Sequence, residues 1–374
     1  MIYFDNAATS FKKPKSVYQR LNRYLKKECG NPGRSSHFIA SKSAEYVYEA
    51  REKVAKLFNL SNPEKVVFTM NATYALNMAI KTLISENSHV IISDVEHNSV
   101  MRPIYSLNKS KGVEYSVFNS AADNIFQEIE KHLRKETRAI VCTLTSNVDG
   151  RELPFYSLSE IKKKHNLKLI IDASQAAGHT DLNLSKYSYD AIALPAHKGL
   201  FGIQGAGVCI FGETIPQESF IEGGSGSESK LLTMPSYLPE KFEAGTLPTP
   251  SIIALSAGID YILSTGIQNI REKEIKLNNA LKYRLNDVKG IKIYGSNNSI
   301  ISFNIDGIGC EKVSAILDSQ KICTRAGLHC APSAHRALGT ETTGTVRVSL
   351  SYFNTIKEID IFWNALKSIK AQYK

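Results

Sequence analysis

The sequence predicts an α/β protein in which a mostly parallel sheet is followed by a smaller α+β domain. Over the first two thirds of the chain, short apolar runs alternate with segments whose apolar residues recur at helical spacing. That alternation is typical of parallel strands joined by helices. After residue 266 it gives way to a long charged helix and to strands and helices without regular alternation. The 374 residues, 43% of them hydrophobic, can bury the cores of about two domains.

Seven candidate strands lie in the first part of the chain. A helix is expected ahead of them at 41–60, where Ala44, Val47, Val54 and Leu57 follow helical spacing. Helical patterns separate most of the strands, so most neighbouring strands should run parallel. The expected strands, each a short apolar run bounded by polar or turn residues, are 65–69, 89–93, 114–118, 138–143, 167–172, 190–194 and 205–211.

The composition changes near residue 222. From 222 to 250 the chain is rich in Gly, Ser, Pro and Thr, which predicts an extended loop region before a helix at 252–264. We expect a large domain at 15–257 and a small domain made of 1–14 and 258–374. Beyond its long charged helix, the small domain should contain strands and helices at 299–305, 311–319, 345–351 and 356–369.

The net charge of +10 and the pI near 9.1 suit an acidic partner or nucleic acid, but the arrangement of the charges does not. The lysines are scattered along the chain, and no basic block is interleaved with aromatic residues. We therefore expect a solvated basic surface and no nucleic-acid partner.

The six cysteines occur without a Cys-x-x-Cys pair or regular spacing, which indicates neither a zinc site nor a disulfide framework. Free thiols fit a reducing cytoplasm. The N-terminus lacks a basic region followed by an apolar stretch, and no run approaches the ~18 apolar residues of a membrane span. We expect a soluble cytoplasmic protein with no membrane partner.

Lys198 and Asp172 form the first pair of residues that indicates chemistry. Asp172 ends the apolar run 167–172, and Lys198 follows His197 at a spacing of 198 − 172 = 26 residues. That spacing leaves room for a helix and one more strand, which would return the lysine to the same edge of the sheet. Pyridoxal phosphate needs a lysine that forms a Schiff base and an acid that keeps the pyridine nitrogen protonated. Alternatively, Asp172 caps the following helix and Lys198 is a solvated surface lysine.

The segment 69–73 suits the phosphate of the same cofactor. It follows a strand and opens a helix, so its backbone N–H groups and the Thr73 hydroxyl would face an anion. An ordinary helix N-cap is the alternative.

Three polar residues near strand ends could contact the pyridine ring of this cofactor. Gln175, one turn past Asp172, could donate to the phenolic oxygen, or it is a surface amide. His97 follows the strand 89–93 at the edge where ligands bind and could stack on a pyridine, or it is structural. Asn147, at the end of another strand, could hydrogen-bond the ring oxygen.

Cys330 lies in Arg325-Ala-Gly-Leu-His-Cys330-Ala-Pro332, where glycine and proline indicate a shaped loop. Nearby cationic groups, Arg325 or a protonated His329, would enlarge the reactive thiolate fraction. The alternative is a small buried hydrophobe, as expected for the other five cysteines. Arg347, in an apolar strand pattern, could grip a substrate carboxylate with its guanidinium fork, or it is an exposed strand arginine.

Together these motifs resemble the class V aminotransferase superfamily of fold type I, and within it the cysteine desulfurases of the Suf-like group with a short cysteine loop. The resemblance implies the fold of pyridoxal-phosphate-dependent transferases, with a mostly parallel seven-stranded sheet in the large domain. It covers nearly the whole chain, through the segments 4–9, 31–37, 71–73, 96–97, 146–147, 172–175, 197–198, 242–246, 325–332 and 346–347.

The resemblance implies a role for each site residue. Lys198 would bind pyridoxal phosphate covalently, Asp172 would pair with the pyridine nitrogen, and His97 would stack on the ring. Thr246 would reach the phosphate from the second subunit of a homodimer. The other contacts to the cofactor would come from Ala72, Thr73, Asn147, Gln175 and His197. The substrate would be bound by Asn6, Arg34, Asn147, Arg325 and Arg347.

The same resemblance implies that the substrate is L-cysteine and the product L-alanine. Lys198 would move the α-proton, and the Cys330 thiolate would attack the substrate sulfur and keep it as a persulfide. A sulfur-acceptor protein or thiol would then collect the sulfur, with iron–sulfur cluster assembly as one destination.

Three positions depart from the family pattern. Pro195 stands where many relatives have Ser or Thr, Leu144 replaces a common histidine, and Ile203 replaces a usual proline. The first removes one hydrogen bond to the phosphate, worth only ~0.5–1.5 kcal/mol net.

Other functions use the same scaffold. A selenocysteine lyase or cysteine sulfinate desulfinase removes a different atom from the β-carbon. A class V aminotransferase would have no use for Cys330, and a non-catalytic interaction protein would not need the complete set of site residues.

Overall fold

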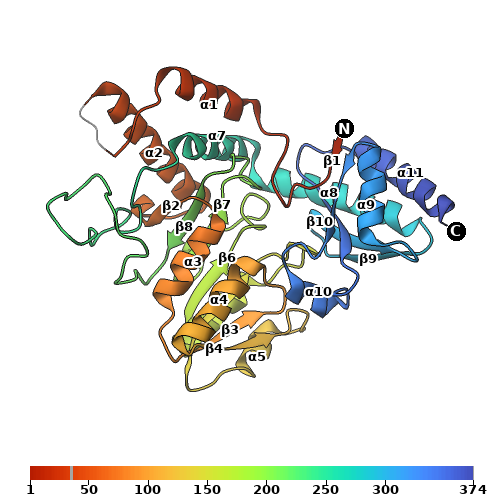
Figure 1. Cartoon of the computed structure of the whole chain (residues 1–374), viewed down its shortest axis with the longest axis horizontal. Coiled ribbons are helices and arrows are strands. Elements are labelled where there is room, and N and C mark those ends of the chain that lie inside the picture. Colours follow the sequence, from red (N-terminus) through yellow and green to blue (C-terminus); the bar gives the residue numbers. More distant parts are fainter. Residues whose placement is uncertain (34–36, 374) are drawn as a thin grey trace.

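A seven-stranded sheet forms the centre of the chain in the computed structural model, which describes residues 1–33 and 37–373 (Figure 1). β8 runs antiparallel to both of its neighbours, and all other neighbouring pairs are parallel. The predicted α/β class and the mostly parallel sheet are confirmed, with each strand end within two residues of its predicted place. In sheet order the strands are β2 (Val66–Thr69), β8 (Gly207–Phe211), β7 (Ala191–Pro195), β6 (Lys168–Asp172), β5 (Thr137–Thr143), β3 (His89–Ser93) and β4 (Glu114–Phe118).

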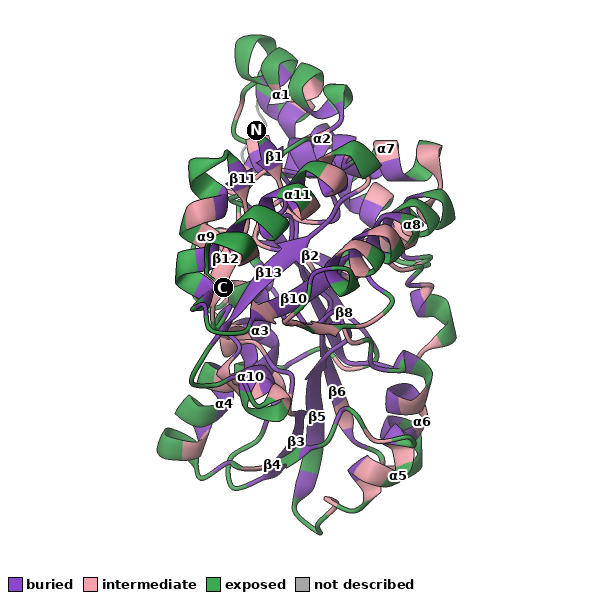
Figure 2. Cartoon of the chain, turned by 90° about the vertical axis from the view of Figure 1, so that its right-hand side faces the viewer, coloured by how far each residue is buried: buried purple, intermediate pink, exposed green. Residues whose placement is uncertain are grey.

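Helices cover both faces of this sheet. Ile91 and Ile171 point into one core, whereas Val90 and Ile170 point into the other. The inner strands are therefore buried on both faces, which explains why they are continuous apolar runs in the sequence; Figure 2 shows them buried beneath helices with exposed outer sides. One core is covered by α3 (Ala72–Leu83) and α4 (Asn98–Lys111), and the other by α2 (Phe38–Leu57), α5 (Ile125–Glu130), α6 (Phe155–His165) and α7 (Thr249–Thr265).

A four-stranded antiparallel sheet occupies the C-terminal part of the chain. Its order is β12 (Arg325–Gly327), β13 (Thr345–Ser349), β10 (Ile300–Ile305) and β9 (Ile291–Gly295). The predicted strands at 299–305 and 345–351 are confirmed. The helices α9 (Cys310–Ser319) and α11 (Ile356–Gln372) pack on this sheet, and both were expected.

One helix of 13 residues, α1, and several shorter elements were not predicted. Most are held by partners far away in sequence, so a local pattern does not reveal them; β1, for example, pairs with β11 across more than three hundred residues. They are α1 (Lys15–Lys27), β1 (Ile2–Tyr3), β9, β11 (Ile322–Cys323), β12 and α10 (Pro332–Leu338).

The long helix α8 (Ile267–Asn286) connects the two sheets. Ile270 packs into a core of the seven-stranded sheet, whereas Leu277, Leu281 and Leu285 pack into the core of the four-stranded sheet. One helix therefore contacts both hydrophobic cores along its length.

The predicted loop region is confirmed, since residues 212–248 contain neither helix nor strand and form the long loop at the left of Figure 1. α7 begins at Thr249, three residues before its predicted start. The predicted boundary at 257/258 lies inside α7, and the division into domains stays a prediction. Among the described residues no single helix is long and apolar enough to span a membrane; α7 and α8 meet that criterion only as a pair bent by 84°.

Candidate active site

One pocket at the carboxyl ends of β5, β6 and β7 gathers eight of the nine residues predicted to bind the cofactor. Parallel strands end at the same edge of a sheet, so residues far apart in sequence meet there. The pocket is lined by Asn71, Ala72, Thr73, Val95, His97, Ser99, Thr143, Thr145, Asn147, Asp172, Ser174, Gln175, Pro195, His197 and Lys198.

Lys198 and Asp172 are brought together by the pairing of β6 with β7. Asp172 is opposite Ala193 in this pair, and the chain continues three residues beyond β7 to Lys198. Burial, opposed by Asp172 and reinforced by Arg347 and Arg325, lowers the pKa of Lys198 to about 8. An amine with this pKa is partly neutral near pH 7, so it is a better nucleophile and base than a surface lysine.

The start of α3 offers free hydrogen-bond donors. The Asn71 side chain caps this helix by accepting from the Tyr74 N–H at 2.8 Å. The N–H groups of Ala72 and Thr73 have no acceptor among the described residues. A Cβ on Gly207 would lie 2.4 Å from the Asn71 carbonyl carbon, so only glycine lets β8 pack this closely. The site predicted at 69–73 therefore has the donors that a phosphate requires.

A second helix N-terminus meets the first. His97 is the N-cap of α4, and its Nδ1 accepts from the Ser99 N–H at 3.0 Å. The Ser99 hydroxyl lies 2.8 Å from Thr73 Oγ1, which links the two helix starts. Sequence reasoning missed Ser99; a hydroxyl residue two positions after His97, where a helix begins, was the available signal.

The histidines of the pocket are neutral. Burial, together with Lys198 and other nearby cations, lowers the pKa of His97 and of His197 to about 4. Because His97 Nδ1 accepts a hydrogen bond, its proton lies on Nε2. His197 Nδ1 is buried without a partner among the described residues, as is Asn147 Oδ1.

These groups fit pyridoxal phosphate. Free N–H donors suit the phosphate, Lys198 suits the aldehyde and Asp172 suits the pyridine nitrogen. The two buried polar atoms without partners are also explained if a polar ligand fills the pocket, because such atoms are rarely left unpaired.

Gln175 is less free than expected. It lines the pocket, but its amide donates to the Ala7 carbonyl at 3.0 Å. That contact holds the N-terminal segment against the pocket wall.

Arg347 is buried, with 1% of its surface exposed, so the alternative of an exposed strand arginine is wrong. Its Nη2 donates to Asp5 at 2.7 Å and its Nη1 to the Asn147 carbonyl at 2.9 Å. Asn6 is also engaged, since its amide donates to the Ser349 carbonyl at 3.0 Å. The guanidinium predicted to bind the substrate carboxylate therefore already binds the carboxylate of Asp5.

Cys330 is exposed, which excludes the alternative of a buried hydrophobe. The carbonyl of Cys330 accepts from the Asn98 N–H at 2.8 Å, and that of His329 accepts from Asn147 Nδ2 at 2.8 Å. Both residues have left-handed φ angles, 57° and 50°. The loop is thus tied at two successive carbonyls to the rim of the pocket.

Of the two cations expected near the thiol, only Arg325 is charged and close to it. Arg325 Nη2 lies 3.8 Å from Cys330 Sγ. The expectation that His329 is protonated is wrong, because burial and the nearby Arg347 lower its pKa to about 2. Of the other cysteines, Cys142, Cys209 and Cys310 are buried as expected and Cys323 is half-buried, but Cys29 is exposed.

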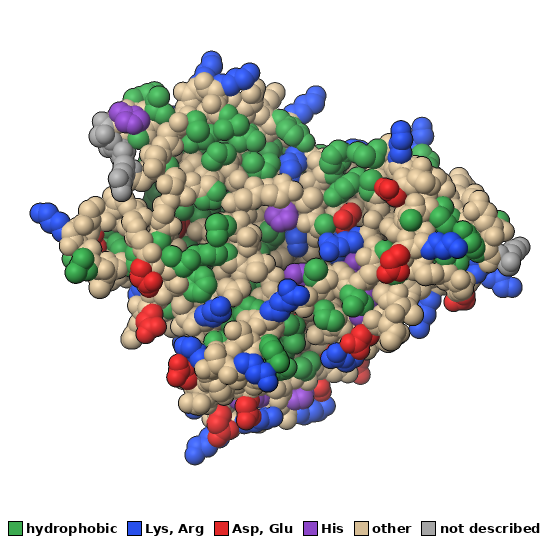
Figure 3. All heavy atoms as spheres, in the orientation of Figure 1, with side chains coloured by type: hydrophobic (Ala, Val, Ile, Leu, Met, Phe, Trp, Pro, Cys, Tyr) green, Lys and Arg blue, Asp and Glu red, His purple; other side chains and the backbone are tan. Residues whose placement is uncertain are grey.

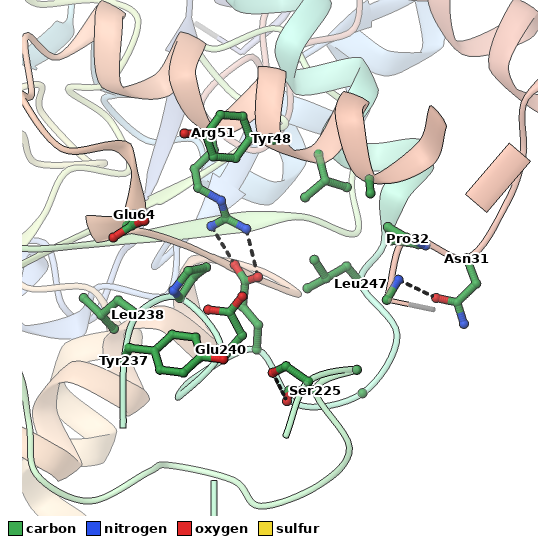
Figure 4. A pocket seen from close by; sticks show the side chains of 18 residues that line it. Asn31, Pro32, Tyr48, Arg51, Glu64, Ser225, Tyr237, Leu238, Glu240 and Leu247 are labelled. Atoms are coloured by element: carbon green, nitrogen blue, oxygen red, sulfur yellow. Dashed lines mark hydrogen bonds and ion pairs between the residues drawn. The ribbon is translucent and has the colours of Figure 1, made fainter. Parts of the chain in front are cut away.

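Five predicted residues in the described part of the chain do not line this pocket: Asn6, Thr246, Arg325, Cys330 and Arg347. Thr246 is exposed in the 212–248 loop, and Arg34 lies outside the described residues. A separate pocket borders that loop (Figure 4), where Arg51 forms two 2.9 Å bonds to Glu243 among Tyr48, Tyr237 and other residues. Of the predicted site residues that the structure describes, none lines this separate pocket.

Comparisons with known proteins find relatives over nearly the whole chain. The model of the aminotransferase class-V family matches residues 2–362. A probable cysteine desulfurase of Methanothermobacter thermautotrophicus is 31% identical over 98% of this chain and 94% of its own. One from Pyrococcus abyssi is 30% identical over 99% and 94%.

Solved structures show the same fold. The apo structure of the cysteine desulfurase from Thermococcus onnurineus superposes with a TM-score of 0.89 at 29% identity, covering 98% of this chain and 94% of that one. The cysteine desulfurase CsdA of Escherichia coli gives the same TM-score at 23% identity, covering 100% and 95%, which is evidence for the fold alone.

Proposed function

The chain belongs to the class-V aminotransferase family, and we propose that it is a pyridoxal-phosphate-dependent cysteine desulfurase with Cys330 as its sulfur carrier. The observation that carries this proposal is an exposed thiol whose loop is tied to the residues of the lysine pocket. A transaminase needs the pocket but not the thiol.

The cofactor, when bound, supplies an electron-withdrawing ring that stores the electrons of the broken Cα–H bond. In the proposed roles, Asp172 keeps a proton on the pyridine nitrogen, and Lys198 takes and returns the proton at the substrate Cα. The pKa of about 8 suits Lys198 to this exchange. The N–H groups of Ala72 and Thr73, with His197, hold the phosphate.

Cys330 then takes the sulfur. Its thiolate attacks the substrate sulfur, a new S–S bond forms, and the Cβ–S bond breaks with its electron pair left on carbon. Protons complete alanine, and Cys330 keeps a persulfide. The guanidinium of Arg325, with Nη2 3.8 Å from Sγ, lies beside the attacking sulfur.

Arg347 is proposed to bind the substrate carboxylate. Asp5 already occupies Nη2, so the substrate must share the fork with Asp5 or displace it. The side chain of Asp5 is 21% exposed, which leaves it room to move.

We also propose that the active form is a homodimer. Thr246 lies away from its own pocket, and the side chains around its loop are apolar and exposed: Phe38, Ile39, Ile221, Leu231, Leu232 and Tyr237. In Figure 3 hydrophobic side chains gather on this part of the surface. A second copy covering it would bring its own Thr246 to the phosphate.

The destination of the sulfur is a thiol or an acceptor protein in the cytoplasm, with iron–sulfur cluster assembly as the expected use. The two tied carbonyls keep the Cys330 loop at the pocket rim, so the acceptor must approach the cysteine. No nucleic acid or membrane takes part in this proposal.

The test is the alanine formed per chain from L-cysteine with a reductant, compared between the wild-type protein and Cys330→Ala. Alanine from the wild-type protein that disappears in the variant supports persulfide chemistry at Cys330. Selenocysteine and cysteine sulfinate serve as parallel substrates. Alanine from these two but none from cysteine would contradict the proposal and favour a lyase or desulfinase.

A further inference from the structure

The backbone next to Lys198 packs so closely against the loop 177–179 that neither Gly199 nor Gly178 has room for a side chain. A Cβ on Gly199 would lie 2.3 Å from the Ala177 carbonyl oxygen and 2.6 Å from Cδ2 and Nε2 of His179. A Cβ on Gly178 would lie 2.3 Å from the Gly199 carbonyl. The ring of His179 therefore supports the residue that follows the lysine, and a shift of this ring would move the lysine backbone.

His179 is held in turn by a buried carboxylate. Its Nδ1 lies 2.8 Å from Glu274 Oε2, with side-chain exposures of 11% and 3%. Burial lowers the pKa of His179, but the Glu274 carboxylate outweighs burial and the net pKa is raised. Lys198 and Arg271 oppose this rise, and Arg271 is itself paired with Glu152 at 3.0 Å.

Glu274 sits where α8 passes from one core to the other. Ile270, one turn before it, packs with the seven-stranded sheet, and Leu277, one turn after it, packs with the four-stranded sheet. The four-stranded sheet carries Arg347 on β13 and ends at β12 just before Cys330. The contact between Glu274 and His179 therefore joins the helix that packs on this sheet to the loop that supports Lys198.

We propose that His179 and Glu274 are positioning residues that hold Lys198 in the pocket and set its place relative to the four-stranded sheet. This inference rests on the proposed function, in which Lys198 binds the cofactor. Neither residue touches the substrate. Without the Glu274 charge, burial again lowers the pKa of His179 and the ring loses its charge-assisted bond to residue 274. The loop of His179 can then relax, and Gly199 moves with it.

The test compares Glu274→Gln with a matched control, Asp190→Asn. Asp190 is also a fully buried carboxylate, 3.5 Å from Lys162 and 3.5 Å from Lys168, but it lies at the amino end of β7, away from the pocket. Both changes turn a buried paired carboxylate into an amide of the same shape. A merely structural role predicts the same result for both.

The first readout is the absorbance of the full chain loaded with pyridoxal phosphate, titrated with pH. We expect Glu274→Gln to shift the midpoint of the cofactor–lysine band and to lower kcat by roughly ten- to a hundredfold, as displaced catalytic groups do, with little change in KM. Asp190→Asn should lower the melting temperature about as much as Glu274→Gln does, but it should keep the wild-type midpoint and kcat.

The second readout does not need turnover. Acetylation of Lys198 in the cofactor-free full chain, followed across pH by mass spectrometry, should shift its midpoint in Glu274→Gln and not in Asp190→Asn. Equal midpoints in all three proteins would overturn the inference. If Glu274→Gln does not fold, Glu274→Asp, which keeps the charge but shortens its reach, is measured by the same criteria.

Failure of the proposed function is distinguishable from failure of this inference. A wild-type protein that forms no alanine from cysteine contradicts the function, whereas the acetylation midpoints of Lys198 still decide the role of the pair. Normal wild-type activity with unchanged midpoints in Glu274→Gln contradicts only the inference.

Discussion

Lys198 owes its chemistry to its surroundings. Burial lowers its pKa to about 8, with Arg347 and Arg325 acting in the same direction and Asp172 against them. The guanidinium groups come from the C-terminal sheet and Asp172 from the large sheet, so both parts of the chain set the state of one amine. The lysine is therefore poised between a protonated and a reactive form near physiological pH.

The lowered pKa makes a prediction about cofactor capture. Only the neutral amine reacts with an aldehyde, and Lys198 is protonated below its pKa and neutral above it. The rate at which the cofactor-free protein captures pyridoxal phosphate should therefore rise with pH and reach half its plateau near pH 8. Stopped-flow absorbance measures this rate; a rate still rising steeply at about pH 10, as for an ordinary lysine, would contradict it.

The residues that sequence analysis could identify are those at strand ends. Asp172, Asn147 and Lys198 follow apolar runs, and parallel strands end at one edge, so their meeting follows from the pattern. The partner of Arg347 could not be found this way. Asp5 is separated from it by 342 residues, and only the folded chain brings them to 2.7 Å.

Two helices begin at the pocket, and each depends on a close backbone contact at its start. The start of α3 is approached by β8 at Gly207, and the first N–H of α4, that of Asn98, holds the carbonyl of Cys330. The helix pattern in the sequence indicated the first of these starts, but neither backbone contact leaves a local signal. Two single changes test these contacts separately.

Gly207→Ala should weaken cofactor binding. Its Cβ would meet the Asn71 carbonyl carbon at 2.4 Å, so either β8 or the start of α3 must move. Forcing a methyl group into such a contact costs about 1–3 kcal/mol, and a displaced α3 aims its N–H groups less well at the phosphate. The Kd for pyridoxal phosphate measures the effect. Gly224→Ala is the control, because a Cβ there has no neighbour within 4 Å, and an equal loss in both variants would contradict the explanation.

Asn98→Pro should loosen the Cys330 loop without harming α4. Proline is favoured at the first position of a helix, and the preceding His97 has an extended backbone that tolerates it. The change removes the N–H that holds the Cys330 carbonyl, a bond worth about 0.5–1.5 kcal/mol. Hydrogen exchange in residues 328–331 should become roughly two- to tenfold faster. Asn98→Ala keeps the N–H and should leave the exchange unchanged.

At the scale of the whole molecule, Thr246 does not line the pocket of its own chain. The loop 212–248 carries Thr246 away from its own pocket and exposes Leu231 and Leu232 beside it. Sequence analysis expected this loop from its composition and a second subunit from the family resemblance. The proposed subunit interface had no local sequence pattern, because the exposed apolar residues around the loop come from separate segments.

The homodimer predicts a complementation. Lys198→Ala removes the reactive amine from its own pocket, and Thr246→Ala should remove a phosphate contact from the partner's pocket. A mixed dimer of the two variants contains one complete site, so exchange of subunits should restore cofactor affinity and activity to about half of the wild-type level. No gain after subunit exchange, with mixed dimers verified by mass spectrometry, would mean that Thr246 does not act across subunits.

The bonds that close the site join distant parts of the polypeptide: the Asn6 amide with the Ser349 carbonyl across 343 residues, and Arg347 with the Asn147 carbonyl across 200. Loops of this length close slowly, and they form after local helices and neighbouring strands. On the ribosome, the residues that ring Lys198 emerge before the last strands are made. Persulfide-forming activity is therefore a late marker of maturation in this protein: a chain can have its secondary structure and its lysine pocket while its two ends have yet to meet.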